Sequence, residues 1–374
     1  MEDNVLVIVF PSIFSLNKIK PLITNIKKIL KIENQKFHKI RQEGDIIIVE
    51  TDDPVFTSSA INTLFGIKRV AIAKQVTNSF DSIVNGISKV GVDLFLESER
   101  FLIRVEGHAK GFMTKDVEVA ATSSLIEKTA KKRIKPGTDE KYDKRLYVYL
   151  TKSHAYICIY SDEGLEGIPN NSQNKKTICC VFDELSAISC IETIKHGFDV
   201  KIIICFVKES ELLHIAKMLN QLIHRMVKPK IDLEFYKVPI DKKPASLLLT
   251  EITIELLSMI AISNDIKRIS LSLSPLIYPI DFLENVVERV YKKNLVPYLP
   301  LSGLDSNVIT SAREIGLEKY LPKIKKYGNT KFCNSKKSMK EIKKIAERSV
   351  RDRKVISIKV AQNNVHDILD KIVS

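Results

Sequence analysis

The sequence lacks the long apolar segment that a membrane-spanning helix needs. Its 374 residues contain no run of about 18 apolar residues. The opening residues, MEDNVLVIVFPSIF, are acidic before they are apolar, and no small-residue cleavage site follows them, which argues against a secretory signal. We therefore expect a cytoplasmic protein without a membrane partner.

Metal-binding patterns are missing as well. The six cysteines form no CxxC pair and show no spacing typical of a metal site. Four of them lie in or beside apolar runs such as TICCVF and KIIICFV, which predicts buried, reduced thiols. We therefore expect no metal site.

Acidic residues are scarce relative to basic ones, and the formal net charge is +14. The surplus is concentrated in residues 318–354, which hold 14 Lys/Arg against four Asp/Glu. Such a segment predicts a polyanionic partner, RNA or DNA, although a solvated basic helix has the same composition. The 44% hydrophobic and 28% charged content is that of a globular protein long enough for two or three domains.

The N-terminal half contains two α+β patterns. Over about the first 75 residues the order is strand, helix, strand, strand, helix, strand, with turns at Gly44 and Gly66, which is the ferredoxin-like pattern. Two further helices and the strands RFLIRVEG, RLYVYL and HAYICIYS follow, the last two as an antiparallel pair. The polar segment EGLEGIPNNSQNKK predicts a loop and a domain boundary near residue 170.

The remaining chain alternates continuous apolar strands with helices, beginning with KTICCVF and DVKIIICFV. This alternation predicts a doubly wound, parallel-sheet α/β domain. We therefore expect domains at residues 1–80, 81–168 and 172–374.

The segment PLSGLDS, residues 300–306, is similar to the Ser-Gly-Gly-x-Asp-Ser loop that holds pyrophosphate in ATP pyrophosphatases. It is one residue too short, and it follows the last predicted parallel strand, whereas a phosphate loop follows a strand at the switch point. We expect Ser302 or Asp305 to cap the next helix. The first strand–helix junction has the right position, but its residues, VFDELS, include no glycine and carry two adjacent carboxylates.

Taken together, these segments resemble the tRNA 4-thiouridine synthase family, the tRNA sulfurtransferases, which are also tied to thiamine biosynthesis. RQEGDIIIVET and LFGIKRV resemble the family's ferredoxin-like domain. FLIRVEGHAKGFMTKDVEVAATSSL and RLYVYLTKSHAYICIY resemble its RNA-binding THUMP domain. The family's Gly-Gly-Leu-Pro linker corresponds to Gly164, Gly167, Ile168 and Pro169, and its Pro-Leu-x-Gly-x-Asp pattern to Pro300, Leu301, Gly303 and Asp305.

The resemblance implies that residues 172–374 form a pyrophosphatase-like (adenine nucleotide hydrolase-like) domain, but the nucleotide motifs differ. The family's Ser-Gly-Gly-Phe-Asp-Ser falls on Val181, Phe182, Asp183, Glu184, Leu185 and Ser186, of which Ser186 alone matches. Residues 271–282 lack the family's Thr-Gly-Glu and Leu-Gly-Gln. Cys333 is the candidate for the family's persulfide cysteine, and a cysteine without a role is the alternative.

Three hypotheses follow. The first is a tRNA-binding protein of this family that lacks ATP-dependent catalysis and has no cofactor. It would act in tRNA modification or as an RNA-binding scaffold, and its further partners could be a catalytic protein or a second copy of the chain in a homodimer. The second is an active sulfurtransferase that makes 4-thiouridine with an atypical site for ATP and Mg. The third is a different enzyme that uses His196, His214 or His224 as acid or base. The candidate RNA contacts are Arg104, Lys110, Lys115, Lys131, Lys132, Arg133, Lys135, Lys325, Lys326, Lys336 and Lys337.

Overall fold

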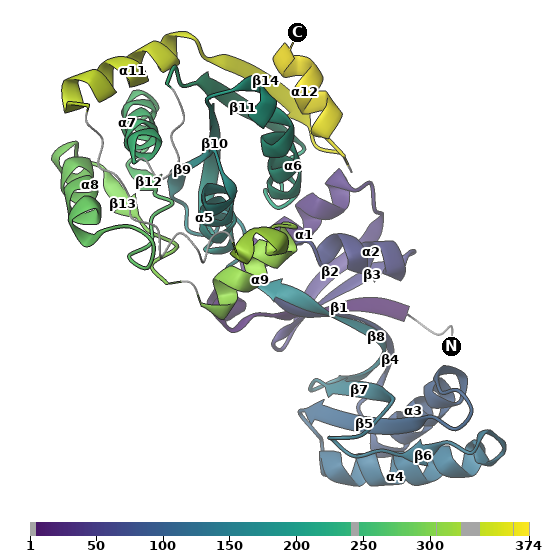
Figure 1. The fold of residues 1–374 in the computed structure, drawn as a ribbon. Coiled ribbons are helices and arrows are strands. Elements are labelled where there is room, and N and C mark those ends of the chain that lie inside the picture. The colour runs from purple at the N-terminus through teal and green to yellow at the C-terminus, as the bar shows by residue number, and fades with distance from the viewer. Residues whose placement is uncertain (1–4, 241–246, 304, 323–336, 362, 374) are drawn as a thin grey trace. The chain divides into compact units, whose positions relative to one another are not determined.

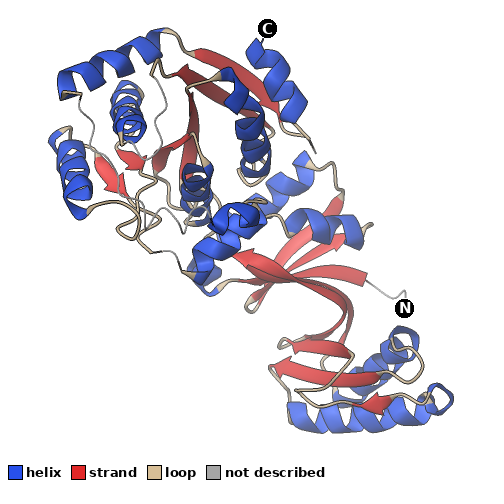
Figure 2. Cartoon of the chain, in the orientation of Figure 1, coloured by secondary structure: helices blue, strands red, loops and turns tan. Residues whose placement is uncertain are grey.

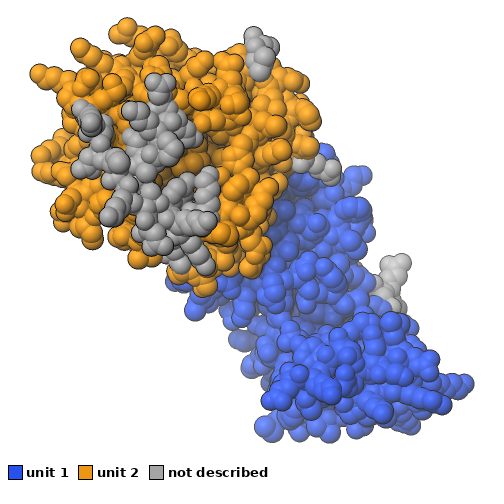
Figure 3. Space-filling model, in the orientation of Figure 1, with its two compact units in different colours: residues 1–166 blue, residues 167–374 orange. Residues whose placement is uncertain are grey.

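The structure is a computed structural model that describes residues 5–240, 247–303, 305–322, 337–361 and 363–373. The chain divides into two compact units, Met1–Glu166 and Gly167–Ser374, drawn in blue and orange in Figure 3. In the described part of the chain, no helix has the length and apolar character to cross a membrane.

Unit 1 begins with the predicted ferredoxin-like arrangement (Figure 1). Its elements are β1 (Val5–Pro11), η1 (Ile13–Lys18), α1 (Ile19–Ile32), β2 (Phe37–Glu43), β3 (Ile46–Thr51), α2 (Pro54–Ile61) and β4 (Ile67–Thr77). The strands are antiparallel in the order β2-β3-β1-β4, which confirms the predicted pattern. Gly66 is the last residue of the turn before β4, and its φ of 91° is a left-handed conformation that favours glycine.

The rest of unit 1 extends the same sheet. Its elements are α3 (Phe80–Leu94), β5 (Arg100–Gly107), α4 (Thr114–Lys128), η2 (Ala130–Lys132), β6 (Lys135–Pro136), β7 (Lys144–Leu150) and β8 (His154–Glu166). β8 pairs antiparallel with both β4 and β7, so eight strands form one sheet in the order β2-β3-β1-β4-β8-β7-β5-β6. β8 continues to Glu166, so the start of the segment predicted as a loop is strand.

Two hydrophobic cores lie along this sheet. In the first, Ile87 of α3 and Leu125 of α4 pack with residues of β5, β7 and β8. In the second, Leu6 and Ile48 pack with Tyr156 of β8. β7 and β8 contribute to both cores, because successive strand residues point to opposite faces.

Unit 2 is the predicted α/β domain (Figures 1 and 2). Its helices are α5 (Glu184–Lys195), η3 (Glu209–Glu211), α6 (Leu212–Ile223), α7 (Leu248–Ser263), α8 (Ile280–Lys292), α9 (Ser306–Glu314), η4 (Glu318–Tyr320), α11 (Met339–Arg351) and α12 (Val365–Val373). Its strands are β9 (Lys176–Val181), β10 (Asp199–Phe206), β11 (Lys230–Lys237), β12 (Arg268–Ser270), β13 (Val296–Tyr298) and β14 (Lys354–Lys359).

The sheet of unit 2 has the order β13-β12-β9-β10-β11-β14. Five strands are parallel, and β14 joins β11 antiparallel at the edge. The predicted fold class is therefore confirmed, with an antiparallel edge strand added. The order reverses between β9 and β12, and the carboxyl ends of these two strands form the switch point, where α/β sheets of this kind bind ligands.

Candidate nucleotide site and nucleic-acid interface

The switch point brings the loop after β9 to the N-terminus of α5. All twelve residues of α5 are buried, so this is the central helix of the unit. Asp183 caps it in extended conformation, and its Oδ1 accepts a hydrogen bond from the Ser186 amide at 2.8 Å. Ser186 Oγ accepts from the amides of Phe182 and Asp183, both at 2.9 Å. Three backbone donors at this junction, the amides of Phe182, Asp183 and Ser186, are therefore bonded to the chain's own side chains.

Glu184 places a second carboxyl group at the N-terminus of α5, next to Asp183. Glu184, in the first turn of α5, is 5% exposed, and its Oε1 lies 3.3 Å from His214 Nε2 on α6. The His214 ring packs edge-on against Tyr320, with 5.2 Å between ring centroids. Glutamate near a helix N-terminus is favoured by the helix dipole, and the same negative charge repels a polyphosphate.

The opposite wall of the switch point is formed by the chain after β12. The strand β12 ends at Ser270. Leu271, Leu273 and Ser274 follow as buried, irregular backbone. The Ser274 carbonyl accepts hydrogen bonds from the Ile277 and Tyr278 amides at 3.0 and 2.9 Å. This wall therefore presents packed apolar side chains.

The segment 300–306 has a structural role. Asp305 is the N-cap of α9, and its Oδ1 accepts from the Asn307 and Val308 amides at 3.0 and 3.1 Å. The predicted helix cap is confirmed and is Asp305 rather than Ser302.

The predicted RNA contacts of unit 1 fall into two groups. Arg104 forms an ion pair with Asp139, and Lys115 Nζ lies 2.8 Å from Glu118. Lys132 Nζ donates to the carbonyls of Val92 and Phe95 at the end of α3, at 2.5 and 3.0 Å. These three cations are engaged within unit 1.

The other predicted cations of unit 1 are exposed and have no partner among the described residues: Lys110, Lys131, Arg133 and Lys135. Three of them belong to a stretch that begins with exposed Lys128 in the last turn of α4, which we call the 128–135 basic segment. It ends in β6, an edge strand of the sheet. The sequence analysis did not select Lys128, or the exposed Lys141 and Arg145 that follow β6.

Several predicted residues of unit 2 lie outside the described residues: Cys333, Lys325, Lys326 and Lys336. Lys337 is described; it is exposed and lies 3.9 Å from Glu341 in the first turn of α11. α11 packs on α7 through a buried face that includes Ile342 and Ala346, and its lysines point outward.

The three candidate histidines do not form one site. His196 follows the C-terminus of α5 and lies with its Nδ1 2.5 Å from the Tyr298 hydroxyl. His214 faces Glu184 at the other end of the same helix, about 18 Å away for twelve residues of α-helix. Burial lowers the pKa of His196, against the opposing effect of Glu192, and raises the pKa of Tyr298 to about 12.

The cysteines fulfil the sequence expectation where the structure describes them. Cys158, Cys179, Cys180, Cys190 and Cys205 are buried and free. Burial raises the pKa of the Cys158 thiol to about 12 and also raises that of Cys180. Within the described ranges, no group of His, Cys, Asp and Glu side chains has the geometry of a metal site.

No protein-family model matches the chain. A probable tRNA sulfurtransferase of Methanosarcina mazei is 25% identical over 164 residues, which is 42% of this chain and 40% of that protein. The chain thus spans less than half the length of this curated relative.

Two solved structures share the fold. PH1313 from Pyrococcus horikoshii has a TM-score of 0.62 at 18% identity, covering 84% of this chain and all of that one. A 4-thiouridine synthetase, solved as an RNA complex with bound ATP, has a TM-score of 0.68 at 14% identity, covering 95% of this chain and 99% of that one. The predicted resemblance is confirmed: the chain is similar to the tRNA sulfurtransferases and has the fold of a 4-thiouridine synthetase.

Proposed function

We propose that this protein is a tRNA-binding relative of the tRNA sulfurtransferases that does not use ATP. One observation carries the proposal: the α5 N-terminus is closed by the chain itself. The side chains of Asp183 and Ser186 occupy three amide groups at this N-terminus, and the buried carboxyl group of Glu184 lies beside them. A phosphate arriving there would have to break three hydrogen bonds and meet like charge.

RNA binding is assigned to unit 1. The 128–135 basic segment supplies Lys128, Lys131, Arg133 and Lys135 as exposed cations without partners among the described residues. Exposed cations of this kind contact phosphates and read the shape of an RNA rather than its sequence. The match to a tRNA sulfurtransferase favours tRNA as the RNA.

In this proposal unit 2 is a scaffold. All residues of α5 are buried, and the described cysteines of unit 2 are buried thiols rather than exposed, activated ones. A catalytic partner protein would then supply the chemistry of tRNA modification. The proposal has two further parts. The phosphate loop at residues 181–186 has lost its nucleotide-binding residues, and residues 81–168 act as a THUMP-like RNA-binding domain.

The test compares ATP binding with tRNA binding in the full chain. ATP–Mg is titrated calorimetrically with and without bound tRNA, and we expect no heat of binding in either case. Labelled tRNA is titrated at several salt concentrations, and we expect affinity to fall steeply with salt. The variant Lys131→Ala/Arg133→Ala/Lys135→Ala should reduce the slope of log K against log salt by about 2–3, since each lost phosphate contact removes roughly 0.7–0.9.

The matched control removes the same charge from α1, as Lys27→Ala/Lys28→Ala/Lys31→Ala. If the control lowers the salt slope of tRNA binding by the same amount, RNA binding cannot be assigned to the 128–135 basic segment. Micromolar ATP binding would instead favour the second hypothesis, an active sulfurtransferase with an atypical site for ATP and Mg.

A further inference from the structure

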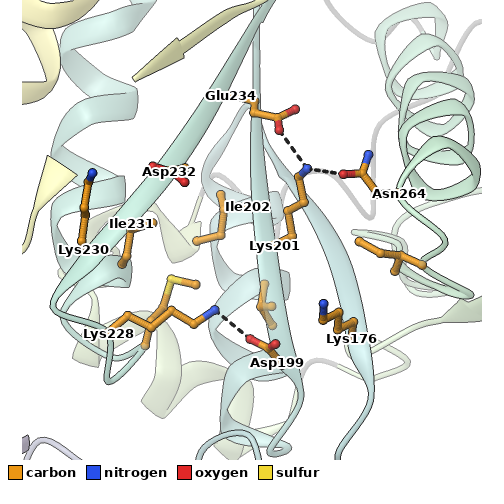
Figure 4. Close-up of a pocket in the computed structure, with 13 residues that line it drawn as sticks. Lys176, Asp199, Lys201, Ile202, Lys228, Lys230, Ile231, Asp232, Glu234 and Asn264 are labelled. Atoms are coloured by element: carbon orange, nitrogen blue, oxygen red, sulfur yellow. Dashed lines mark hydrogen bonds and ion pairs between the residues drawn. The ribbon is translucent and has the colours of Figure 1, made fainter. Parts of the chain in front are cut away.

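An open, charged hollow lies at the amino ends of the parallel strands of unit 2, at the opposite edge of the sheet from the switch point. Its volume is about 370 Å³, within the range of roughly 300–1,000 Å³ typical of small-ligand sites. Its lining includes Lys176, Lys201, Lys228 and Lys230 (Figure 4). Parallel sheets are usually covered by helices on both faces, so a charged hollow on such a sheet requires an explanation.

The carboxylates of the hollow already have partners. Asp199 Oδ1 accepts from Lys228 Nζ at 2.7 Å. Glu234 Oε1 lies 2.8 Å from Lys201 Nζ, and Figure 4 shows both ion pairs as dashed lines. The third carboxylate, Asp232, accepts from the Ser357 hydroxyl of β14 at 2.5 Å. The lining thus holds four lysines against three carboxylates, and Asp232, bonded to a neutral hydroxyl, keeps its negative charge.

Two lysines of the hollow have no such partner. Lys176 and Lys230 are exposed, and neither makes an ion pair or side-chain hydrogen bond with the described part of the chain. Lys176 pairs in register with Asp199, which is bonded to Lys228 instead, and Lys230 stands directly opposite Lys359 of β14. Like charges at directly opposite positions of an antiparallel pair destabilise each other. An anion between or beside them would relieve this repulsion.

Lysines near a helix C-terminus can interact with its carbonyls, which carry partial negative charge, and α7 ends beside the hollow. The lysine that does so here is Lys201, not Lys176 or Lys230. Lys201 Nζ donates to Oδ1 of Asn264, the C-cap of α7, at 2.8 Å, and Asn264 Nδ2 donates to the Ile260 carbonyl. Lys176 and Lys230 therefore remain as cations of the lining that make no ion pair with the described residues, and four lysines against three carboxylates leave the lining with one net positive charge.

We propose that this hollow is an anion-binding site that takes a phosphate group, held by Lys176 and Lys230 with Lys359 at its rim. Val200, Ile202, Met226, Ile231 and Ile266 also border the hollow, but each is at most 5% exposed, so the charged side chains supply most of the surface that a ligand would contact. The phosphate could belong to a small phosphorylated compound or to an RNA backbone. The site does not depend on RNA binding by unit 1, because inorganic phosphate tests it directly.

The experiment measures the melting temperature of the full chain in phosphate and in chloride at equal ionic strength. We expect phosphate to raise it, and Lys176→Gln/Lys230→Gln to bind phosphate about tenfold more weakly, as judged from the phosphate concentration needed for the same shift. The control Lys217→Gln/Lys340→Gln removes two exposed lysines of unit 2 that do not line the hollow. It should behave like the unmodified chain.

Folding of the variant is checked in chloride, where its melting temperature should be equal or higher because one like-charge pair has been removed.

A second experiment identifies the source of the phosphate by measuring acetylation of Lys176 and Lys230 in the presence of AMP or tRNA. Protection by AMP supports a small phosphorylated compound, and protection by tRNA alone supports an RNA backbone. Equal phosphate responses in the double variant and in the unmodified chain would overturn the proposal, as would the absence of any phosphate effect.

Discussion

Replacing Ser186 by alanine tests whether the α5 N-terminus is closed as described. The hydroxyl accepts hydrogen bonds from the Phe182 and Asp183 amides and donates to the Asp183 carbonyl at 2.8 Å. Ser186 is fully buried, and Phe182 is 9% exposed, so water has little access to the groups that the substitution leaves unbonded. The cost should therefore exceed that of losing an exposed helix cap.

The magnitude follows from the unsatisfied groups. A buried donor left without a partner costs about 1–3 kcal/mol. Two amides lose their acceptor, and the half-buried Asp183 amide can recover part of its loss through water. We therefore expect Ser186→Ala to lower the free energy of opening α5 by about 2–3 kcal/mol.

The assay is hydrogen exchange followed on α5 peptides, because the chain has two units and a global two-state unfolding free energy is not defined for it. Thr310→Ala is the control: its exposed hydroxyl donates to the Ser306 carbonyl on α9, and the change should cost within about 0.5 kcal/mol. The same exchange measurement is repeated with ATP–Mg. If ATP–Mg bound the native chain and its concentration were about 100 times its dissociation constant, the free energy of opening would rise by about 2.7 kcal/mol.

Two results would refute the reasoning. A loss below about 0.5 kcal/mol in Ser186→Ala would mean that the side chain does not close the loop. Protection of α5 by ATP–Mg in the unmodified chain would mean that phosphate displaces Asp183 and Ser186.

Three further predictions concern unit 1 and the cysteines. Lys132→Ala should lower stability by about 1 kcal/mol while leaving tRNA affinity within about twofold in salt titrations, because its ammonium bonds the end of α3. Burial would raise the pKa of Glu43, but hydrogen bonds from Thr151, His154 and Tyr156 outweigh it and lower the pKa below 4.5. The stability that this carboxylate contributes is present above pH 4.5 and is lost as pH falls through the lowered pKa, so Glu43→Gln should flatten acid unfolding curves in that window. The five buried cysteines should react with a thiol reagent only after denaturation, and fast reaction of more than one thiol in the native protein would contradict this.

Much of the fold was predictable because local signals agree. The order of strands and helices and the glycine turns predicted β1 to β4, and continuous apolar runs predicted β9 and β10. The continuity of the unit 1 sheet was not predictable. It depends on β4 pairing with β8 from Ile67↔Glu166 to Thr77↔His154, and pairing between segments so distant along the chain has no local sequence signal. β14 joined the parallel sheet as an antiparallel edge for the same reason.

The candidate site was predictable in part. The absence of glycine at the β9–α5 junction correctly suggested an altered loop, but the sequence analysis treated Asp183 and Glu184 only as repulsive charges. The structure adds that Asp183 and Ser186 cap the helix mutually, which depends on backbone geometry. Lys132 was selected as an RNA contact because it lies in a run of cations. Its reach to the carbonyls of α3 depends on tertiary packing, which the run does not encode.

The position of β8 between β4 and β7 has a consequence for synthesis on the ribosome. β4 is complete at Thr77, but the strand that covers its free edge begins at His154. Throughout translation of the intervening residues, β4 can pair with β1 on one side, but its other edge, eleven residues long, has no partner strand. Until β8 emerges, this edge is open to incorrect strand pairing, and chaperones that hold exposed strands would act in this interval.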